Sequence, residues 1–277
     1  MKVLVTGSAG FLGTVVLDVL RARGYEPVGY DLEHGDDVLD LAALTRALRG
    51  CVACIHLAAV ADLYVAEARP GVAETVNVEG TRCVAQACAA VGARMLYAST
   101  CCVYGNNGVA LCDERATPAP TEIYARTKLV AEAFVSLAGP RSSVLRLATF
   151  YGPRMRDSLA TSVFLRRVRA GRPLEIHGSG QQTRCYTHVD DVASAIAVVL
   201  GSARELPCVN VATPEVTSVL ELAELAMQVT GVRVPLHFVA DRPGQIHHSR
   251  IDSSLLQRLG WTPRWSMREG LAACVEV

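Results

Sequence analysis

A tyrosine and a lysine stand four positions apart, at Tyr124 and Lys128, in a segment whose pattern predicts a helix over residues 123–137. At that spacing both side chains project from one helix face, one turn apart. A free tyrosine has a pKa of about 10, and a base working near neutrality needs about three units less. Burial raises a tyrosine pKa, whereas a neighbouring ammonium lowers it. The pair therefore predicts proton transfer by Tyr124 with Lys128 as the activating cation; the alternative is an ordinary exposed helix face.

Three glycines, Gly7, Gly10 and Gly13, lie between a predicted strand (2–6) and a predicted helix (11–23). In such a turn the first glycine permits the tight bend, the second lets a pyrophosphate approach the backbone, and the third lets the helix lie close to the sheet. The free N–H groups at the helix start then face the phosphates. The pattern predicts a dinucleotide site; the alternative is a turn without a ligand.

An acidic residue, Asp31, ends the next predicted strand (27–31), 18 residues after Gly13. A carboxylate at this position accepts hydrogen bonds from the ribose hydroxyls of a dinucleotide. It also repels a 2′-phosphate, and no arginine lies within residues 31–38 to bind one. The sequence therefore favours NAD over NADP.

The elements that position these residues alternate between strand and helix. Strands are expected at 2–6, 27–31, 52–57, 94–99 and 144–147, and helices at 11–23, 41–48, 73–91 and 123–137. Such alternation predicts an α/β fold, a doubly wound parallel sheet of Rossmann type with helices on both faces. After residue 152 the pattern changes: helices are expected at 189–200 and 219–229, then a Pro/His-rich loop and a short helix near 253–259. A small discontinuous C-terminal lobe for the substrate is the simplest architecture.

Composition excludes several classes of protein. The 277 residues include 27 Lys+Arg and 27 Asp+Glu, so no basic field is available for nucleic acid or an anionic membrane. No apolar run is long enough to span a bilayer. Ten cysteines are scattered along the chain, and the N-terminus is typical of a strand rather than a signal peptide, so reduced thiols in the cytoplasm are expected. Cys51 and Cys54 have no second pair at zinc spacing, so no metal site is expected.

Together these motifs resemble the extended short-chain dehydrogenases/reductases, in particular the NAD-dependent nucleotide-sugar epimerase/dehydratase family and its members like UDP-glucose 4-epimerase. The resemblance runs nearly end to end. Besides the residues above, it rests on His56-Leu57-Ala58-Ala59, Asn77-Val78-Glu79-Gly80-Thr81, Ser99-Thr100, Val103-Tyr104-Gly105, Tyr151-Gly152-Pro153, Arg184 to Asp191, Arg242-Pro243-Gly244 and Leu259-Gly260-Trp261.

The resemblance implies a role for each matching position. The catalytic residues would be Thr100, Tyr124 and Lys128. The NAD-binding residues would be Gly7, Gly10, Phe11, Leu12, Gly13, Asp31, Asp37, Val38, Leu57, Ala58, Ala59, Asn77, Ser99, Tyr124 and Lys128. The residues that contact the sugar nucleotide would be Thr100, Tyr124, Thr149, His177, Arg184 and Arg242. NAD binding is expected from residues 1–150 with about 187–212, and substrate binding from about 151–186 with 213–277.

The family begins its several reactions with a common step, in which the tyrosine takes a hydroxyl proton while a hydride passes to NAD. Related dehydratases carry an Asp-Glu pair directly after the threonine, and decarboxylases keep the Glu; here Cys101 and Cys102 occupy those positions. A thiol of ordinary pKa is a poor substitute. Epimerisation at C4 of a nucleotide sugar, UDP favoured over dTDP, is therefore expected. A ketoreductase or dehydrogenase, a dehydratase or decarboxylase, and a non-catalytic NAD sensor are the alternatives. The resemblance also implies a homodimer formed through the helices at 73–91 and 123–137.

Overall fold

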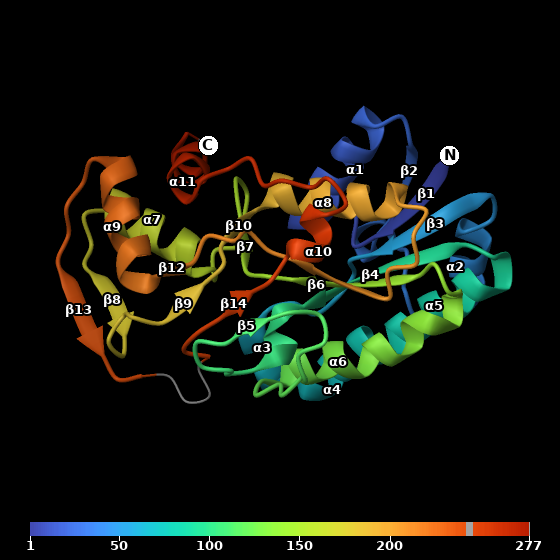
Figure 1. Cartoon of the computed structure of the whole chain (residues 1–277), viewed down its shortest axis with the longest axis horizontal. Coiled ribbons are helices and arrows are strands. Elements are labelled where there is room, and N and C mark those ends of the chain that lie inside the picture. The colour runs from blue at the N-terminus through green and yellow to red at the C-terminus, as the bar shows by residue number, and fades with distance from the viewer. Residues whose placement is uncertain (242–245, 277) are drawn as a thin grey trace.

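A six-stranded parallel sheet forms the centre of the molecule, in the order β11-β6-β4-β3-β1-β2 (Figure 1). The computed structural model describes residues 1–241 and 246–276. The strands of the sheet are β1 (Lys2–Thr6), β2 (Glu26–Tyr30), β3 (Cys51–His56), β4 (Arg94–Thr100), β6 (Ser143–Leu147) and β11 (Cys208–Val211). The predicted α/β class with a parallel sheet is thus confirmed. Its central strands are short and apolar because a parallel sheet is covered on both faces.

Helices cover both faces of the sheet, since successive strand residues point to opposite sides. In β1, Val3 and Val5 are buried against one helical layer, and Leu4 is buried against the other. The first layer consists of α1 (Phe11–Ala22) and α8 (Val189–Gly201), and the second of α2 (Leu41–Ala47), α5 (Gly80–Val91) and α6 (Ile123–Val135). None of the helices in the described part of the chain is long and apolar enough to span a bilayer.

The strand order reverses at β1, which pairs with β2 on one edge and with β3 on the other. In an open parallel sheet such a reversal leaves a crevice outside the carboxyl ends of the strands, where ligands bind. The glycine turn after β1 and the loop after β3 meet at this crevice. A Cβ atom added to Gly7 would lie 2.6 Å from the amide nitrogen of Ala58.

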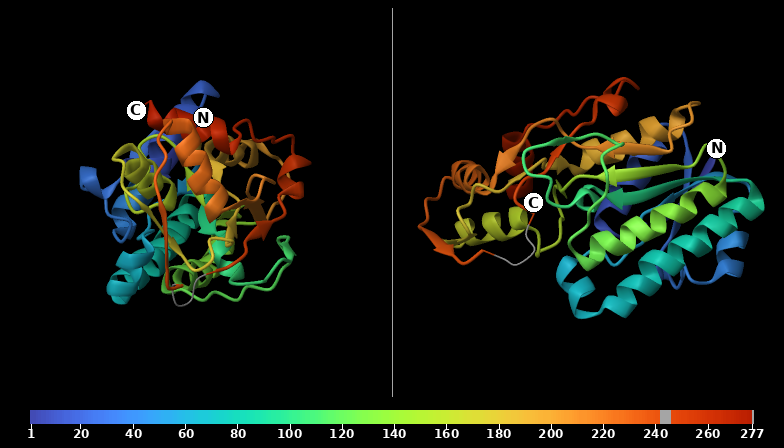
Figure 2. Two further views of the ribbon diagram at one scale, coloured as in Figure 1. Left: turned by 90° about the vertical axis from the view of Figure 1, so that its left-hand side faces the viewer. Right: turned by 60° about the horizontal axis from the view of Figure 1, so that its bottom comes forward.

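The second part of the chain builds a smaller lobe beside the sheet (Figures 1 and 2). Its larger elements are α7 (Ala160–Arg169), β8 (Leu174–His177), α9 (Val219–Thr230), β13 (Leu236–Val239) and α11 (Met267–Val275). Phe164, Leu174, Leu222 and Leu271 belong to one core that these elements share. The remaining short helices and strands, from both parts of the chain, are α3 (Leu63–Ala68), α4 (Pro70–Glu74), β5 (Leu111–Cys112), β7 (Phe150–Tyr151), β9 (Thr183–Arg184), β10 (Thr187–His188), β12 (Thr217–Ser218), β14 (Arg250–Ile251) and α10 (Ser254–Gln257).

The helix expected over residues 73–91 differs from the expectation. A π-helical turn at Thr75–Glu79 separates α4 from α5. Asn77 lies inside this turn with its side chain fully buried. Single π-helical turns within α-helices occur frequently at functional sites.

In the lobe, two helices and a strand were not expected. α7 carries three arginines, yet Phe164, Leu165 and Val168 give it one buried face. α11 begins at a capping box in which Ser266 and Glu269 each bond the other's backbone N–H. The segment expected as a Pro/His-rich loop contains β13, which pairs in parallel with β8. That pairing joins positions about 60 residues apart, so the local pattern does not reveal it.

Candidate active site

The glycine turn is held by close packing on two sides. Gly7 has a φ of +68°, a conformation that favours glycine. At Gly13 a Cβ atom would overlap the carbonyl oxygen of Gly7, so the start of α1 lies directly on the turn. Gly10 differs, because a Cβ atom there would meet only that carbonyl oxygen, at 3.2 Å. The space beyond Gly10 is therefore open to an approaching group.

Asp31 is held beside this turn by two backbone amides. Its Oδ2 accepts a hydrogen bond from the N–H of Ala9 at 2.9 Å, and its Oδ1 accepts one from the N–H of Glu33 at 3.0 Å. The side chain stays partly exposed at the end of β2. A fixed carboxylate thus lies next to the open space beyond Gly10.

The other residues predicted at the cofactor divide into core and surface positions. Leu12 and Val38 are buried, and Val38 packs so closely on α5 that a Cβ atom at Gly80 would lie 2.9 Å from its Cγ2. Asp37 is exposed, and its Oδ1 accepts from the N–H of Leu39. The partly buried positions are Phe11, Leu57, Ala58 and Ala59. Phe11 stacks on Phe150, with ring centroids 5.7 Å apart, and so connects the turn to the start of the lobe.

Asn77 fastens the loop after β3 to α6. Its Oδ1 accepts from the N–H of Val60 at 2.8 Å, and its Nδ2 donates to the carbonyl of Val60 and to the hydroxyl of Thr127. Thr127 precedes Lys128 on the helix that also carries Tyr124. Asn77 therefore positions both the loop and the helix.

Thr100 and Tyr124 face each other across the end of the sheet. Thr100 is the last residue of β4, and its hydroxyl accepts from the N–H of Cys102 at 3.1 Å. Tyr124 lies in the first turn of α6. Burial raises the pKa of Tyr124 above its usual value, while Arg156 and a hydrogen bond with Thr100 lower it less strongly. The protein alone thus leaves this tyrosine protonated, and further positive charge is needed to make it a base.

Lys128 lies one turn further along α6, with only 2% of its surface exposed. Its Nζ is 4.3 Å from the centre of the Tyr97 ring. Burial lowers the pKa of Lys128 to about 7, although the Glu132 carboxylate opposes the change. Burial and the charge of Lys128 together lower the pKa of His56 to about 3, so this neighbour on β3 is neutral.

The two cysteines after Thr100 point in different directions. Cys101 is 5% exposed and donates from Sγ to the carbonyl of Arg146 at 3.1 Å, inside the sheet. Cys102 is partly exposed near Thr100 and Tyr124. Burial raises the pKa of both thiols, although Thr100 and Arg184 partly oppose this at Cys102. Both cysteines are therefore protonated at neutral pH, and only Cys102 lies at the site.

The residues predicted to contact substrate are spread over the lobe. Arg184 lies on β9, close enough to Cys102 to lower its pKa. Thr149 is partly exposed, and its carbonyl accepts from the N–H of Thr187. His177 is exposed at the end of β8, where its Nδ1 is 3.3 Å from the carbonyl of Ala240. Arg242 lies outside the described residues.

Arg156 is a residue at the site that sequence reasoning missed. Its charge lowers the pKa of Tyr124, and its guanidinium lies 3.9 Å from the carboxylate of Asp62. Asp62 also accepts from the hydroxyl of Ser158 at 2.7 Å. These contacts join the loop after β3 to the loop after β7, and the arginine-rich composition near residue 154 was their only signal in the sequence.

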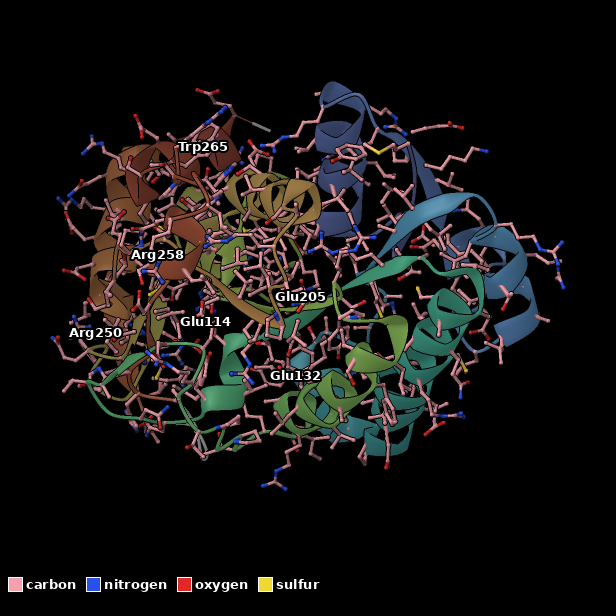
Figure 3. The ribbon with its side chains drawn as sticks, turned by 45° about the vertical axis from the view of Figure 1, so that its right-hand side comes forward. Glu114, Glu132, Glu205, Arg250, Arg258 and Trp265 are labelled. Carbon is pink, nitrogen blue, oxygen red and sulfur yellow. The ribbon has the colours of Figure 1, made fainter. Side chains whose placement is uncertain are left out.

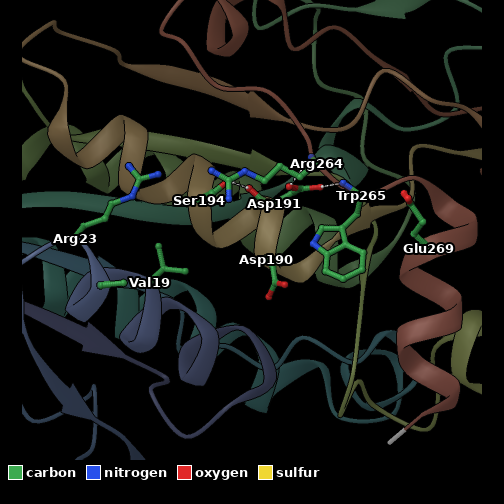
Figure 4. Close-up of a pocket in the computed structure, with 9 residues that line it drawn as sticks. Val19, Arg23, Asp190, Asp191, Ser194, Arg264, Trp265 and Glu269 are labelled. Carbon is green, nitrogen blue, oxygen red and sulfur yellow. Dashed lines mark hydrogen bonds between the residues drawn. The ribbon is translucent and has the colours of Figure 1, made fainter.

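A hollow of about 640 Å³ lies elsewhere, between α1, α8 and residues 264–269 (Figure 4). Within it, the buried carboxylate of Asp191 accepts from the N–H groups of Arg264 and Trp265 at 2.9 and 3.1 Å. Trp265 stacks on His188 at 4.3 Å. Among the residues that the structure describes, none of those predicted to bind cofactor or substrate lines this hollow. These contacts join the C-terminal segment to α8. Nor do any three His, Cys, Asp or Glu side chains of the described ranges gather as metal ligands would.

Comparison with known proteins agrees with this geometry. Residues 3–212 match the family model described as the NAD dependent epimerase/dehydratase family. UDP-glucose 4-epimerase from Mycolicibacterium smegmatis is 31% identical, over 100% of this chain and 98% of that protein. UDP-glucuronic acid decarboxylase 1 from Xenopus tropicalis is 30% identical, over 98% of this chain and 70% of that protein.

Among solved structures, that of MoeE5 in complex with UDP-glucuronic acid and NAD is similar throughout. The identity is 31%, the TM-score is 0.92, and the match covers 100% of this chain and 98% of that one. The glycine turn, Asp31 and the Tyr124/Lys128 pair thus occur in a chain whose whole fold is that of a known NAD-binding protein. The chain belongs to the NAD dependent epimerase/dehydratase family, and its cofactor is NAD.

Proposed function

We propose that the protein is an NAD-dependent nucleotide-sugar epimerase that inverts C4 of a UDP-sugar through a transient 4-keto intermediate. One observation carries the choice among the reactions of the family. The site offers Thr100, Tyr124 and Lys128 for proton transfer, but after Thr100 it offers protonated thiols instead of carboxylates.

The described residues fit NAD. The open space beyond Gly10 suits a pyrophosphate, and the fixed carboxylate of Asp31 suits a ribose with two free hydroxyls. The loop at residues 57–59 and Asn77 would enclose the nicotinamide side. When bound, NAD supplies reversible hydride acceptance and a positive ring next to the tyrosine.

The protein's own residues transfer the proton of the sugar hydroxyl. Thr100 holds the sugar hydroxyl and the Tyr124 phenol in one hydrogen-bonded chain, and Tyr124 takes the hydroxyl proton. Lys128 supplies the cation that lowers the tyrosine pKa against the effect of burial. In the return step Tyr124 gives the proton back, after the keto sugar has presented its other face.

Elimination of water or loss of carbon dioxide needs another acid or base at the sugar. Cys101 is turned into the sheet, where its Sγ donates to a backbone carbonyl. Cys102 faces the site, but burial raises its pKa, so the thiol stays protonated at neutral pH and is not available as a base. This arrangement supports epimerisation over the dehydratase and decarboxylase alternatives.

The test is incubation of the purified protein with a panel of UDP- and dTDP-sugars, without added cofactor, followed by chromatography and mass spectrometry. UDP-glucose and UDP-glucuronic acid come first, because MoeE5 was solved with each of them. An isomer of unchanged mass supports the proposal. A product lighter by water or carbon dioxide supports a dehydratase or decarboxylase, and turnover only with added NADH or NAD supports a ketoreductase or dehydrogenase.

The proposal also assigns parts of the chain. Residues 1–150 with about 187–212 bind NAD, and about 151–186 with 213–277 bind the sugar nucleotide, with Arg184 near the diphosphate. We also propose a homodimer through the helices at residues 73–91 and 123–137, and the exposed side chains of Val130 and Leu137 in the second range support it. A cytoplasmic location is supported by ten cysteines that are all free thiols.

A further inference from the structure

Lysine is rare in this protein. Of the 27 basic residues other than histidine, only Lys2 and Lys128 are lysines, and the rest are arginines. Arginine stays charged in any environment, whereas a buried lysine gains and loses its proton readily. The charge at position 128 therefore depends on its surroundings.

The surroundings of Lys128 include one buried ion pair. Glu132 lies four residues further along α6, on the same helix face as Lys128. Figure 3 shows the position of Glu132 in the molecule. Its carboxylate receives two hydrogen bonds from Arg146 on β6, at 2.8 and 3.1 Å. Ser99 on β4 donates to the same carboxylate at 2.5 Å. The side chains of Arg146 and Glu132 are only 8% and 11% exposed.

The charges of this group do not cancel. Lys128 and Arg146 bring two positive charges, and Glu132 brings one negative charge. Among the described residues, the other titratable groups near Lys128 are the neutral His56 on β3 and the phenol of Tyr97 on β4, and Tyr124 lies one turn earlier on α6. The group becomes neutral overall when Tyr124 loses its proton. The uncompensated charge thus favours the tyrosinate.

We propose that Glu132 and Arg146 are positioning residues that set the charge on Lys128 in opposite directions. The carboxylate of Glu132 favours the protonated lysine, and Arg146 limits that effect by pairing with Glu132. The role of this pair in catalysis rests on the proposed function, in which Lys128 activates Tyr124. Neither residue touches substrate; both act through Lys128. An ion pair with a purely structural role would stabilise the fold without any effect on Lys128.

Two substitutions separate these roles, because both break the same ion pair but change the charge in opposite directions. Glu132→Gln keeps the shape and removes the negative charge, so Lys128 should lose its proton at lower pH. Arg146→Met removes a positive charge and frees Glu132 for Lys128, which should then lose its proton at higher pH. A charge within about 4–6 Å of a titratable group shifts its pKa by about one unit or more.

The measurement is NMR titration of protein labelled with 13C and 15N in lysine. It needs no substrate, and the exposed Lys2 provides the reference signal. We expect a wild-type midpoint for Lys128 near pH 7, a lower midpoint in Glu132→Gln and a higher one in Arg146→Met. Glu132→Asp, which keeps the charge, should restore the wild-type midpoint. If one of these two variants does not fold, the Lys128 midpoint of the other still tests the proposal.

Midpoints that stay unchanged, or that move in one direction in both variants, would overturn the inference and leave a structural ion pair. In an active preparation, the pH at which turnover falls on the alkaline side should be lower in Glu132→Gln and higher in Arg146→Met than in the wild type. If the midpoints move as expected but no nucleotide sugar is converted, the proposed function fails while the control of Lys128 stands.

Discussion

Asn77 donates from Nδ2 to the hydroxyl of Thr127, 2.9 Å away, and so fastens a π-helical turn to the helix that carries Tyr124 and Lys128. The same amide is bonded to both backbone groups of Val60. One fully buried side chain therefore sets the distance between the loop after β3 and the catalytic helix. The π-helical turn thus contains the residue that makes this bridge.

Replacing Asn77 by alanine should lower the free energy of unfolding by about 2–3 kcal/mol, because buried partners are left without hydrogen bonds. NAD affinity should fall as well, since the loop at residues 57–60 is released. Denaturant unfolding and NAD titration measure the two effects. Thr127→Val is the comparison, since it removes one of the three hydrogen bonds of Asn77, and the bond from Thr127 to the carbonyl of Tyr124, but leaves Asn77 bonded to Val60. NAD affinity should therefore fall less than in Asn77→Ala. Equal NAD affinity in wild type and Asn77→Ala would mean that the loop is positioned without this bridge.

Replacing Tyr124 by phenylalanine should lower turnover by about two to four orders of magnitude, because the proton acceptor is lost while the ring is kept. NAD should remain bound. Steady-state rates and the absorbance of retained cofactor are the measurements. Tyr97→Phe is the control: it keeps the ring under Lys128 and loses the 3.5 Å contact of its hydroxyl to the carbonyl of Lys128 and a hydrogen bond with Thr81, so turnover should change little. Full activity of Tyr124→Phe would remove the tyrosine from the mechanism.

Replacing Asp31 by alanine should weaken NAD binding far more than binding of the sugar nucleotide. The carboxylate would be lost from the ribose, and the turn would lose the bond from the N–H of Ala9. Calorimetric titration with each ligand separately measures both affinities. Glu33→Ala removes a nearby exposed carboxylate and serves as the control. Equal weakening of both ligands would place Asp31 outside the cofactor site.

What the sequence reveals depends on how far apart the interacting residues lie. The glycine turn, Asp31 and the Tyr124/Lys128 spacing are local patterns, so they are readable directly. The short-range alternation of strands and helices in residues 1–150 is readable for the same reason. The π-helical turn is not readable in this way, since the hydrogen-bond partners of its Asn77, Val60 and Thr127, lie 17 and 50 residues away along the chain.

The charges around Lys128 are even harder to predict from local sequence patterns. Glu132 is in reach of a sequence argument, as it stands four residues after Lys128. Arg146 is not, because it reads as one residue of a buried strand, and only the fold pairs it with Glu132. The Tyr97 ring beneath Lys128 likewise comes from another strand. Local sequence patterns thus identify the reacting groups, whereas the fold determines which charged and aromatic side chains surround them.

The adjacent Cys101 and Cys102 allow the choice of reaction to be tested within two neighbouring positions. Cys102→Ser should leave epimerase turnover within about threefold, because a protonated thiol does no acid–base work in that reaction. Cys101→Ala should change turnover equally little but lower the free energy of unfolding by about 1–2 kcal/mol, since it empties a buried volume. Turnover and denaturant unfolding of both variants are the measurements. A loss above tenfold in Cys102→Ser at unchanged stability would give the thiol a catalytic role, and the function would move toward elimination or decarboxylation.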